Sequence, residues 1–400
     1  MLGDLTVIEL GDFVSAPYCG KLLVDLGADV IKVESPGYGD SARRYGPFSS
    51  DIPDPEGSGL FLYLNSNKHS VTLDIETAIG ASVFKDMVRF ADVVLESMPI
   101  GFLEERGLSF DSLSAINPNL VMVSITPFGQ TGPYRYYKSC DLVTSHMSGL
   151  AYSTPDIKSR DDPPVKPSMH YSDLTAGLTG SVAMLSAILT MSRGGGAQHL
   201  DISEQESMLA LMRFAFDEYT ASGDVPDRFG PAAVAFGPHG NFRCKDGYIN
   251  LTCLTDQQWR YFKEAIGNPE WADSEVFDTS VGRGAYRDAM EPLVEEWTVK
   301  WTKEEIYRHM QAYHFPAFPV NTIEEFVASD HFNARGFLVD MVHPAVPTFR
   351  VPRPPYIFAD ITGKAESAAP FLGEHTEQIF CDRLGYTRKQ LAELRQEGTV

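Results

Sequence analysis

The chain has 400 residues, and 54 aspartate and glutamate residues outnumber 33 lysine and arginine residues, giving a net charge of −21. Nucleic-acid binding depends on clustered cations, so this charge argues against it, and it also argues against attachment to an anionic membrane surface. The length allows two or three domains with a substantial core. Five cysteines without a CxxC pair indicate neither a disulfide framework nor a zinc site and favour a reducing cytoplasm.

Two segments bear on the location of the protein. The start, MLGDLTVIEL, lacks the basic region and cleavage site of a signal peptide. The stretch from Leu174 to Met191 carries no charge and is long enough to span a bilayer. However, it is interrupted by serine, threonine and glycine residues. We therefore expect a buried helix that packs closely through small residues, in a soluble cytoplasmic protein.

The first 200 residues alternate short β-branched runs with helical patterns. Strands are expected at 7–10, 30–34, 93–95 and 120–126, and helices at 17–27, 78–90 and 101–106. Such alternation predicts an α/β fold in which helices cover a parallel sheet. Ligands bind these sheets at the carboxyl ends of the strands.

The second half of the chain has a different organisation. A long helix is expected at 204–222, followed by a Gly/Pro/Ala-rich loop at 228–240 and a hairpin at 241–253. A tryptophan-containing helical block is expected at 256–313, a late strand at 337–342 and a terminal helix from Thr387. These changes predict the boundaries of the domains. We expect a large domain over 1–200, a linker helix at 201–224, a small domain over 225–325, and a C-terminal part, 326–400, that returns to the large domain.

Several common catalytic motifs are missing. The sequence has no GxGxxG between a strand and a helix, no GxxxxGK[ST], no HExxH and no GxSxG. Its ten histidines show no HxH or i,i+4 pairing, so a metal site is not expected. These absences argue against a nicotinamide-dependent enzyme, a P-loop nucleotidase, a zinc hydrolase and an α/β-hydrolase.

Two isolated carboxylates are the main catalytic candidates. Asp173 directly precedes the uncharged helical stretch, and Asp141 enters another apolar run. Both fit the role of a helix N-cap, in which the carboxylate accepts backbone hydrogen bonds. A carboxylate held in this way also stays ionised, and with an acyl group it can act as a nucleophile. Composition and spacing leave both interpretations open.

Two cations are equally ambiguous. Lys68 stands in the segment NSNKHSVTLD, just before an expected strand, and Arg43 follows the turn GYGD. Each side chain fits a solvated turn or a contact with a phosphate group. The residues alone therefore indicate an acidic α/β enzyme whose site is unknown.

These segments together resemble the class III CoA-transferases, the formyl-CoA transferase or CaiB/BaiF family. The resemblance runs in order through nearly the whole chain and is carried by LGADVIKVESPGYGDSARRYGP, NSNKHSVTLD, ADVVLESMPIGFLEERGL, INPNLVMVSITPFGQTGPY, SDLTAGLTGSVAMLSAIL and APFLGEHTEQIF. It implies a Rossmann-like large domain with a parallel sheet, a smaller α+β domain and an interlocked homodimer. It also implies that CoA moves from an acyl-CoA to a free carboxylic acid, with no metal and no cofactor beyond CoA.

The resemblance also implies roles for particular residues. Asp173 falls on the nucleophile, which forms an aspartyl anhydride and then an aspartyl-CoA thioester, and Asp141 falls on a second acidic position. The implied CoA contacts are Lys68, Leu73, Ser97 and Met98, with Lys138 and Arg43 as further candidates. The implied substrate loop contains Gly237, His239 and Gly240. This loop has two glycines where formyl-CoA transferases have four, which puts formate and oxalate chemistry in doubt.

Two alternatives remain beside CoA transfer. A 2-methylacyl-CoA racemase of the same fold needs a histidine and an aspartate on opposite sides of the α-carbon. Its histidine would directly precede Asp141, where this chain has Cys140, and neither His146 nor His170 occupies that position. The other alternative is an inactive CoA-binding protein, against which the presence of Asp173 and Asp141 argues.

Overall fold

The chain divides into two compact units. The computed structural model describes residues 1–154, 163–225, 236–359 and 367–400. The large unit consists of Met1–Leu150, Lys166–Met212 and Gly336–Val400, and the small unit consists of Ala151–Val165 and Arg213–Arg335. Most of the Gly/Pro/Ala-rich loop expected at 228–240 lies outside the described residues.

A six-stranded sheet forms the centre of the large unit. Its strands are β1 (Thr6–Leu10), β2 (Asp29–Glu34), β3 (His69–Thr72), β4 (Val93–Glu96), β5 (Val121–Thr126) and β6 (Gln198–Ser203). All neighbouring pairs are parallel, in the order β3-β2-β1-β4-β5-β6. The predicted parallel α/β fold is therefore confirmed. The order reverses between β1 and β4, which is where sheets of this type bind ligands.

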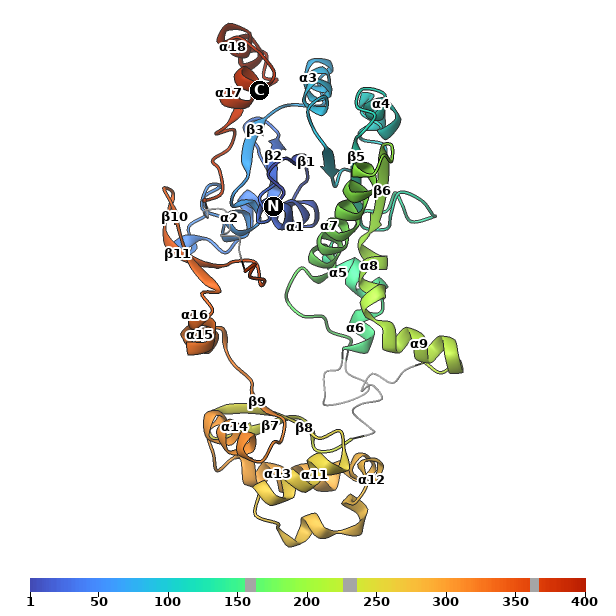
Figure 1. Cartoon of the computed structure of the whole chain (residues 1–400), viewed down its shortest axis with the longest axis vertical. Coiled ribbons are helices and arrows are strands. Elements are labelled where there is room, and N and C mark those ends of the chain that lie inside the picture. Colours follow the sequence, from blue (N-terminus) through green and yellow to red (C-terminus); the bar gives the residue numbers. More distant parts are fainter. Residues whose placement is uncertain (155–162, 226–235, 360–366) are drawn as a thin grey trace. The chain divides into compact units, whose positions relative to one another are not determined.

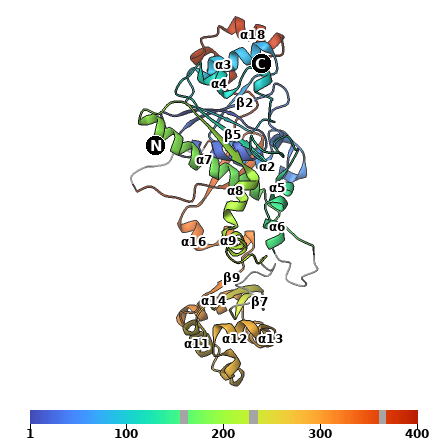
Figure 2. The ribbon, with the colours of Figure 1, turned by 90° about the vertical axis from the view of Figure 1, so that its right-hand side faces the viewer.

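Helices cover both faces of this sheet (Figures 1 and 2). One face carries α1 (Ser15–Val24) and α7 (Tyr171–Ser192), and the other carries α3 (Ala78–Val88), α4 (Phe110–Ser114) and α18 (Arg388–Gln396). Alternate strand residues feed the two cores, because successive side chains of a strand point to opposite faces. Val93 and Leu95, for example, lie in the core on the α1 and α7 side, whereas Val94 lies in the other.

Helix α7 packs on α1 through small residues, as predicted, but the expectation that the whole helix is buried is wrong, because only one face of it is buried. A Cβ atom added to Gly177 would lie 2.6 Å from the carbonyl oxygen of Ser15, so only glycine permits this approach. By length and composition α7 could cross a membrane, but one such helix is weak evidence for a membrane span. Its other face is apolar and exposed, at Leu178, Val182 and Leu189.

The large unit also contains shorter elements. They are α2 (Gly59–Asn65), α5 (Asp141–Met147), α8 (Glu204–Leu211), α17 (Thr376–Gln378) and a hairpin of β10 (Leu338–His343) and β11 (Val346–Pro352), while α6 (Leu150–Ser153) lies at the unit boundary. The single helix expected over 204–222 is wrong. Met212 has φ −86° and ψ 29°, which ends α8 before α9 (Arg213–Ser222) begins.

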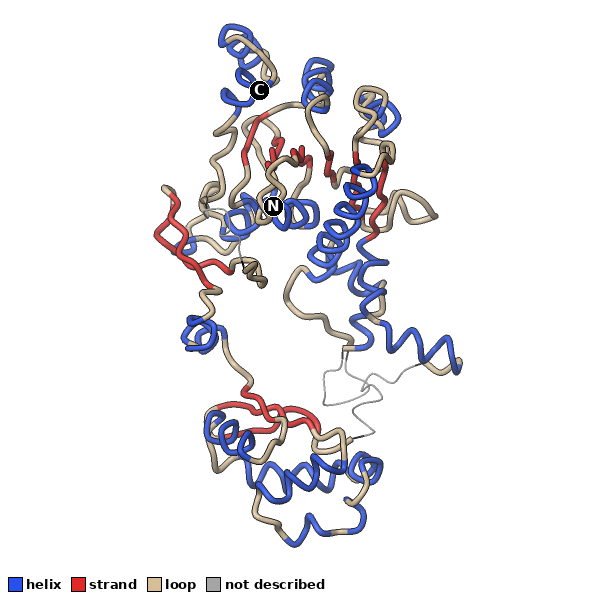
Figure 3. The backbone as a smooth tube through the Cα atoms, in the orientation of Figure 1, coloured by secondary structure: helices blue, strands red, loops and turns tan. Residues whose placement is uncertain are grey.

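The small unit combines an antiparallel sheet with helices (Figure 3). Its strands, in sheet order, are β7 (His239–Cys244), β8 (Gly247–Thr252) and β9 (Ala317–Pro319), so the predicted hairpin is confirmed. Its helices are α11 (Asp256–Ala265), α12 (Ser280–Ala285), α13 (Arg287–Thr298), α14 (Lys303–Ala312), α15 (Ile323–Ala328) and α16 (Asp330–Ala334). Trp259 and Phe262 are buried in its core, which confirms the predicted smaller α+β fold.

A buried ion network joins the carboxyl ends of β1 and β2. The Lys32 ammonium group contacts Glu9 Oε1 at 2.9 Å and Asp40 Oδ2 at 2.6 Å, and all three side chains are fully buried. The other oxygen of Glu9 binds Lys68 at 2.7 Å. Burial alone would lower the pKa of Lys32, but the charges of Asp40 and Glu9 raise it. The network thus keeps Lys32 charged inside the protein.

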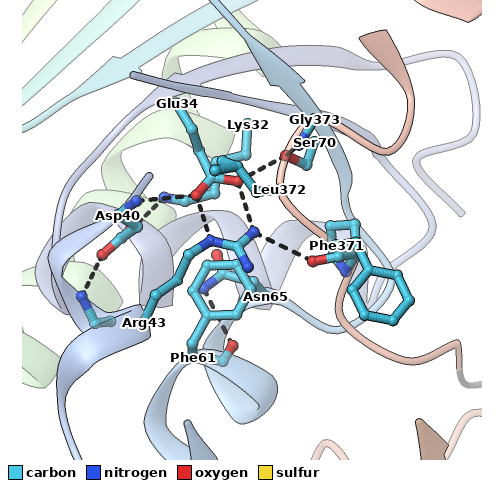
Figure 4. Close-up of polar contacts among 12 residues, drawn as sticks. Lys32, Glu34, Asp40, Arg43, Phe61, Asn65, Ser70, Phe371, Leu372 and Gly373 are labelled. Atoms are coloured by element: carbon cyan, nitrogen blue, oxygen red, sulfur yellow. Dashed lines mark hydrogen bonds and ion pairs between the residues drawn. The ribbon is translucent and has the colours of Figure 1, made fainter. Parts of the chain in front are cut away.

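The second half of the network ties the C-terminal segment to β2 and β3 (Figure 4). Arg43 binds both oxygens of Glu34, through Nε at 2.7 Å and Nη2 at 2.9 Å, and its Nη2 also donates to the carbonyl oxygen of Pro370. Glu34 Oε1 accepts a hydrogen bond from Ser70 Oγ, which in turn accepts one from the amide of Gly373. Residues more than 300 positions apart are therefore fixed to one another.

We expect Arg43→Met to destabilise the large unit strongly. It leaves the carboxylate of Glu34 buried without its ion-pair partner, which costs about 3–5 kcal/mol in comparable cases. Arg44→Met is the matched control, because Arg44 is exposed and such a residue contributes less than about 1 kcal/mol. Urea denaturation of both variants measures the difference. Equal free energies of unfolding would contradict the structural role of Arg43.

Candidate active site

Three buried carboxyl groups lie at the beginnings of three packed helices. Asp141 is the first residue of α5, Asp173 lies in the first turn of α7, and Glu204 is the first residue of α8. Each residue is less than a tenth exposed, and the three helices contact one another in the large unit. Helix N-termini carry a partial positive charge, so this arrangement stabilises negative charge.

Asp173 points into this cluster beside a histidine. Helix α7 begins at Tyr171 with His170 as its N-cap, so the interpretation of Asp173 as an N-cap is wrong. The carboxylate of Asp173 lies 3.3 Å from His170 Nδ1. Burial raises the pKa of Asp173, and the charge of Asp141 adds to this effect. The contact with Asp173 also raises the pKa of His170, which favours an imidazolium next to the carboxylate.

Asp141 fixes the beginning of α7 from outside that helix. Cys140 is the N-cap of α5, so the interpretation of Asp141 as the N-cap of its own helix is wrong. Its Oδ1 instead accepts hydrogen bonds from the amide of Ser172 at 2.8 Å and from Ser172 Oγ at 2.9 Å. Its Oδ2 lies 2.7 Å from Lys166 Nζ. Asp141 therefore holds the residue next to Asp173 in place.

Glu204 is a member of the cluster that sequence reasoning missed. It directly follows β6, and its carboxyl group is buried at the beginning of α8. Burial raises the pKa of Glu204 to about 8, and the negative charge of Asp173 contributes. A signal was present in the sequence, because Ser203 and Glu206 form the S-x-x-E pattern of a helix start, and Ser203 Oγ accepts the amide of Glu206.

Aromatic rings cover His170. Phe13 and Tyr45 contact its imidazole edge-to-face, with ring centroids 5.0 Å and 5.7 Å away. Phe13 has φ +65°, an uncommon value for a residue with a side chain, and its amide donates to Asp40 Oδ1 at 3.0 Å. Asp40, a member of the ion network, thus holds the ring that packs on His170.

The residues expected to bind CoA fall into two groups. Leu73 is buried directly after β3, the Oγ of Ser97 accepts the amide of Asp12, Met98 is half-buried, and Lys138 is exposed. Lys68 is buried, and its three N–H donors bind Glu9 Oε2, the carbonyl oxygen of Pro17 and Asn65 Oδ1. Because Lys68 has three donors in all, none is left for a phosphate group in this conformation. Arg43 is likewise held inside the ion network, so both cations have a structural role here.

A separate pocket of about 240 Å³ lies beside Met98. Glu96, Ser124 and His199 are among its lining residues, and Ser124 Oγ lies 2.9 Å from His199 Nε2. Burial raises the pKa of Glu96 to about 7. Within the described parts of the chain, no group of three His, Cys, Asp or Glu side chains is arranged to hold a metal ion.

The expected substrate loop belongs to the small unit. Gly237 precedes β7, and its carbonyl oxygen accepts a hydrogen bond from Arg283 Nε at 2.8 Å. His239 and Gly240 are the first two residues of β7. Burial lowers the pKa of His239, and the charge of Arg287 contributes. The structure thus brings Asp141 and Asp173 together in the large unit and describes Gly237, His239 and Gly240 within the other unit.

Comparison with known proteins identifies the family of the chain. Residues 2–376 match the model of CoA-transferase family III. Succinyl-CoA–D-citramalate CoA-transferase from Chloroflexus aurantiacus is 32% identical over all of this chain and 98% of its own length. Succinate–glutarate CoA-transferase from Agrobacterium fabrum is also 32% identical, over 95% of each chain.

A solved structure agrees with these relatives. The crystal structure of a CAIB/BAIF family protein from Brucella suis has 34% sequence identity and a TM-score of 0.85, and the match covers 95% of this chain and 98% of that one. The family model, these curated relatives and the shared fold all indicate the same family. The chain therefore belongs to the class III CoA-transferases, CoA-transferase family III.

Proposed function

We propose that this enzyme transfers CoA from an acyl-CoA to a free carboxylic acid through covalent intermediates on Asp173. The observation that carries the proposal is the position of Asp173, a buried carboxylate in the first turn of α7 beside His170. The segment around it, SDLTAGLTG, is also where the chain resembles the nucleophile region of its family. A carboxylate can attack an acyl group and store it as an anhydride.

The proposed route has four balanced steps. An oxygen of Asp173 bonds to the thioester carbonyl carbon, the C–S bond breaks, and CoA leaves as a thiolate. The thiolate then attacks the aspartyl carbonyl carbon of the anhydride, which releases the donor acid and leaves an aspartyl-CoA thioester. The acceptor carboxylate attacks that thioester, again releasing the thiolate. The thiolate finally attacks the new acyl carbon, which frees both the new acyl-CoA and Asp173.

The surroundings of Asp173 suit these steps. Every species that attacks or leaves is an anion, and the N-termini of α5, α7 and α8 stabilise negative charge in the cluster. Lys166 and His170 add positive charge next to Asp141 and Asp173. Burial also keeps water away from the anhydride and thioester, which water would hydrolyse. The route needs CoA itself and no metal or redox cofactor.

We propose a dicarboxylic acyl-CoA as the donor and a dicarboxylic acid as the acceptor. The two relatives named above have succinyl-CoA with citramalate, and succinate with glutarate, in their names. They share about a third of their residues with this chain over nearly its whole length. The substrate loop has fewer glycines than formyl-CoA transferases, which favours larger acids over formate and oxalate.

Racemisation fits the geometry less well. The two groups of a racemase must approach the α-carbon from opposite sides, so that one removes a proton as the other delivers one. His170 and Asp173 instead lie 3.3 Å apart and contact each other directly. Cys140, at the position expected for the racemase histidine, is the N-cap of α5.

We also propose that two copies of the chain form a homodimer in the cytoplasm. The exposed face of α7 carries Leu178, Val182 and Leu189, and an apolar groove beside it includes Leu178 and Leu185. Apolar faces of this kind are typical of interfaces between subunits. All five cysteines are free, which suits a reducing compartment.

The mass in solution tests the dimer. Because one chain has a mass of 44.2 kDa, light scattering after gel filtration should give twice that value. The result should not change under reducing conditions, because the proposed interface is apolar and needs no disulfide. A mass of 44.2 kDa at all concentrations would contradict the proposal.

Asp173→Asn should abolish CoA transfer, because the amide cannot form the aspartyl anhydride. We expect the rate to fall by at least about 10³-fold, as for the loss of a covalent nucleophile. CoA affinity, measured by calorimetry, should stay within about threefold of wild type. Hydroxylamine traps the aspartyl thioester, and mass spectrometry should place the label on the peptide with Asp173 in wild type alone. Turnover by the variant would remove Asp173 as the nucleophile.

A single assay in D₂O separates the possible activities. Succinyl-CoA and 2-methylacyl-CoAs are incubated with a mixture of glutarate, malate, citramalate and monocarboxylic acids, and the thioesters are analysed by mass spectrometry. We expect new dicarboxylic acyl-CoAs without deuterium at the α-carbon. Deuterium without any new thioester would instead indicate a racemase. Absence of both products would contradict the proposed substrates.

A further inference from the structure

The Nδ1 atom of His170 is a buried polar atom without a normal hydrogen bond. Among the described residues it has no hydrogen-bond partner, and it lies 3.3 Å from Oδ2 of Asp173. This distance is slightly beyond the usual N–H···O range of about 2.7–3.2 Å. Buried polar atoms without a partner are rare, and catalytic hydrogen bonds are often long until substrate is bound. The position of this nitrogen therefore points to a role in the reaction of Asp173.

Packing, and not helix capping, orients the imidazole ring. His170 directly precedes α7, yet within the described chain its side chain makes no capping hydrogen bond. The rings of Phe13 and Tyr45 contact it edge-to-face, at interplanar angles of 90° and 67°. These two rings also contact each other, with their centroids 5.1 Å apart. Three mutually packed rings therefore hold the imidazole beside Asp173.

The two oxygens of Asp173 take different parts in the covalent route. Because His170 contacts Oδ2, we assign the attack on the donor thioester to Oδ1. Oδ2 is then the carbonyl oxygen of the aspartyl group in both the anhydride and the thioester. The CoA thiolate and later the acceptor carboxylate attack the carbon of this group, Cγ, and each attack moves the C=O electron pair onto Oδ2. Negative charge thus develops twice on the oxygen that lies next to Nδ1.

We propose that His170 is a catalytic residue whose Nδ1–H group donates a hydrogen bond to Oδ2 while the aspartyl carbonyl group is attacked. This inference rests on the proposed function of Asp173. In the second step the Cγ–S bond forms, the Cγ–Oδ1 bond breaks, and the donor acid leaves with Oδ1. In the third step an oxygen of the acceptor bonds to Cγ as the C–S bond breaks. Both steps return the electron pair from Oδ2 to the carbonyl bond, so His170 keeps its proton.

The surroundings of Nδ1 suit this role. Asp173 is buried, and a fixed donor stabilises a developing oxyanion more strongly where water is excluded. The imidazolium and the neutral ring with its hydrogen on Nδ1 can both supply the donor. The contact with Asp173 raises the pKa of His170, which favours the imidazolium. Loss of one donor of this kind slows comparable enzymes by about 10²–10³-fold.

Two substitutions separate the donor from the ring. His170→Phe keeps an aromatic ring against Phe13 and Tyr45 but has no donor, whereas His170→Asn loses the ring and can place its amide nitrogen near the position of Nδ1. We expect kcat/KM to fall by about 10²-fold in His170→Phe and by less than about tenfold in His170→Asn. Each half reaction includes one attack on Cγ, so kcat/KM for the donor and for the acceptor should fall together. CoA affinity, measured by calorimetry, should stay within about threefold of wild type.

The matched control is His146→Phe, because His146 is exposed on α5, and this variant should keep the wild-type values. Three results would overturn the role of His170. They are wild-type activity in His170→Phe, higher activity in His170→Phe than in His170→Asn, and a fall in kcat/KM for one substrate alone.

His170→Gln gives an independent readout if His170→Phe does not fold. Its amide nitrogen reaches the position of Nε2 instead of Nδ1, so we expect it to be at least about tenfold slower than His170→Asn. A rate equal to or above that of His170→Asn would contradict the proposal. Wild-type enzyme that transfers no CoA, or that carries no hydroxylamine label on Asp173, would instead contradict the proposed function itself.

Discussion

The architecture depends on a lysine ammonium group that is buried at the carboxyl end of the sheet. Lys32 remains charged there because Glu9 and Asp40 contact it from two sides. Burying such ions is costly unless each one is paired, and removal of one partner leaves the others unsatisfied. Asp40 also holds the amide of Phe13, whose ring packs on His170. A continuous set of contacts therefore connects the centre of the sheet with the contact between His170 and Asp173.

Regular patterns made much of the fold predictable, and local exceptions made the rest unpredictable. The β-branched runs around Val30 and Val121 predicted their strands correctly. Both strands are buried on both faces, and such strands appear in the sequence as nearly continuous hydrophobic runs. The edge strand β6, with the sequence QHLDIS, was not expected, because only its last two residues are buried. The break at Met212 has no glycine or proline to signal it, so the helix expected there was too long.

The candidate site was predictable from motifs and not from residue chemistry. The resemblance selected Asp173 and Asp141, and the structure places both in one buried cluster. Residue type alone left Lys68 as either a solvated turn residue or a phosphate contact, and the resemblance made it a CoA contact, yet its donors are used inside the protein. Glu204 was not singled out from the sequence, since its burial depends on the packing of α8 against α5 and α7. Only the fold could show which charged residues face the interior.

The return of the C-terminal segment has a consequence for biosynthesis. The hydrogen bond from Arg43 to the carbonyl oxygen of Pro370 joins residues 327 positions apart. At about 5–20 residues per second, a ribosome needs roughly 15–65 seconds to make the intervening chain. Nearly the whole small unit is made in that interval, because it includes Arg213–Arg335. The nascent chain can therefore complete its small unit first, while Arg43 and Ser70 wait for Pro370 and Gly373, which emerge near the end of translation.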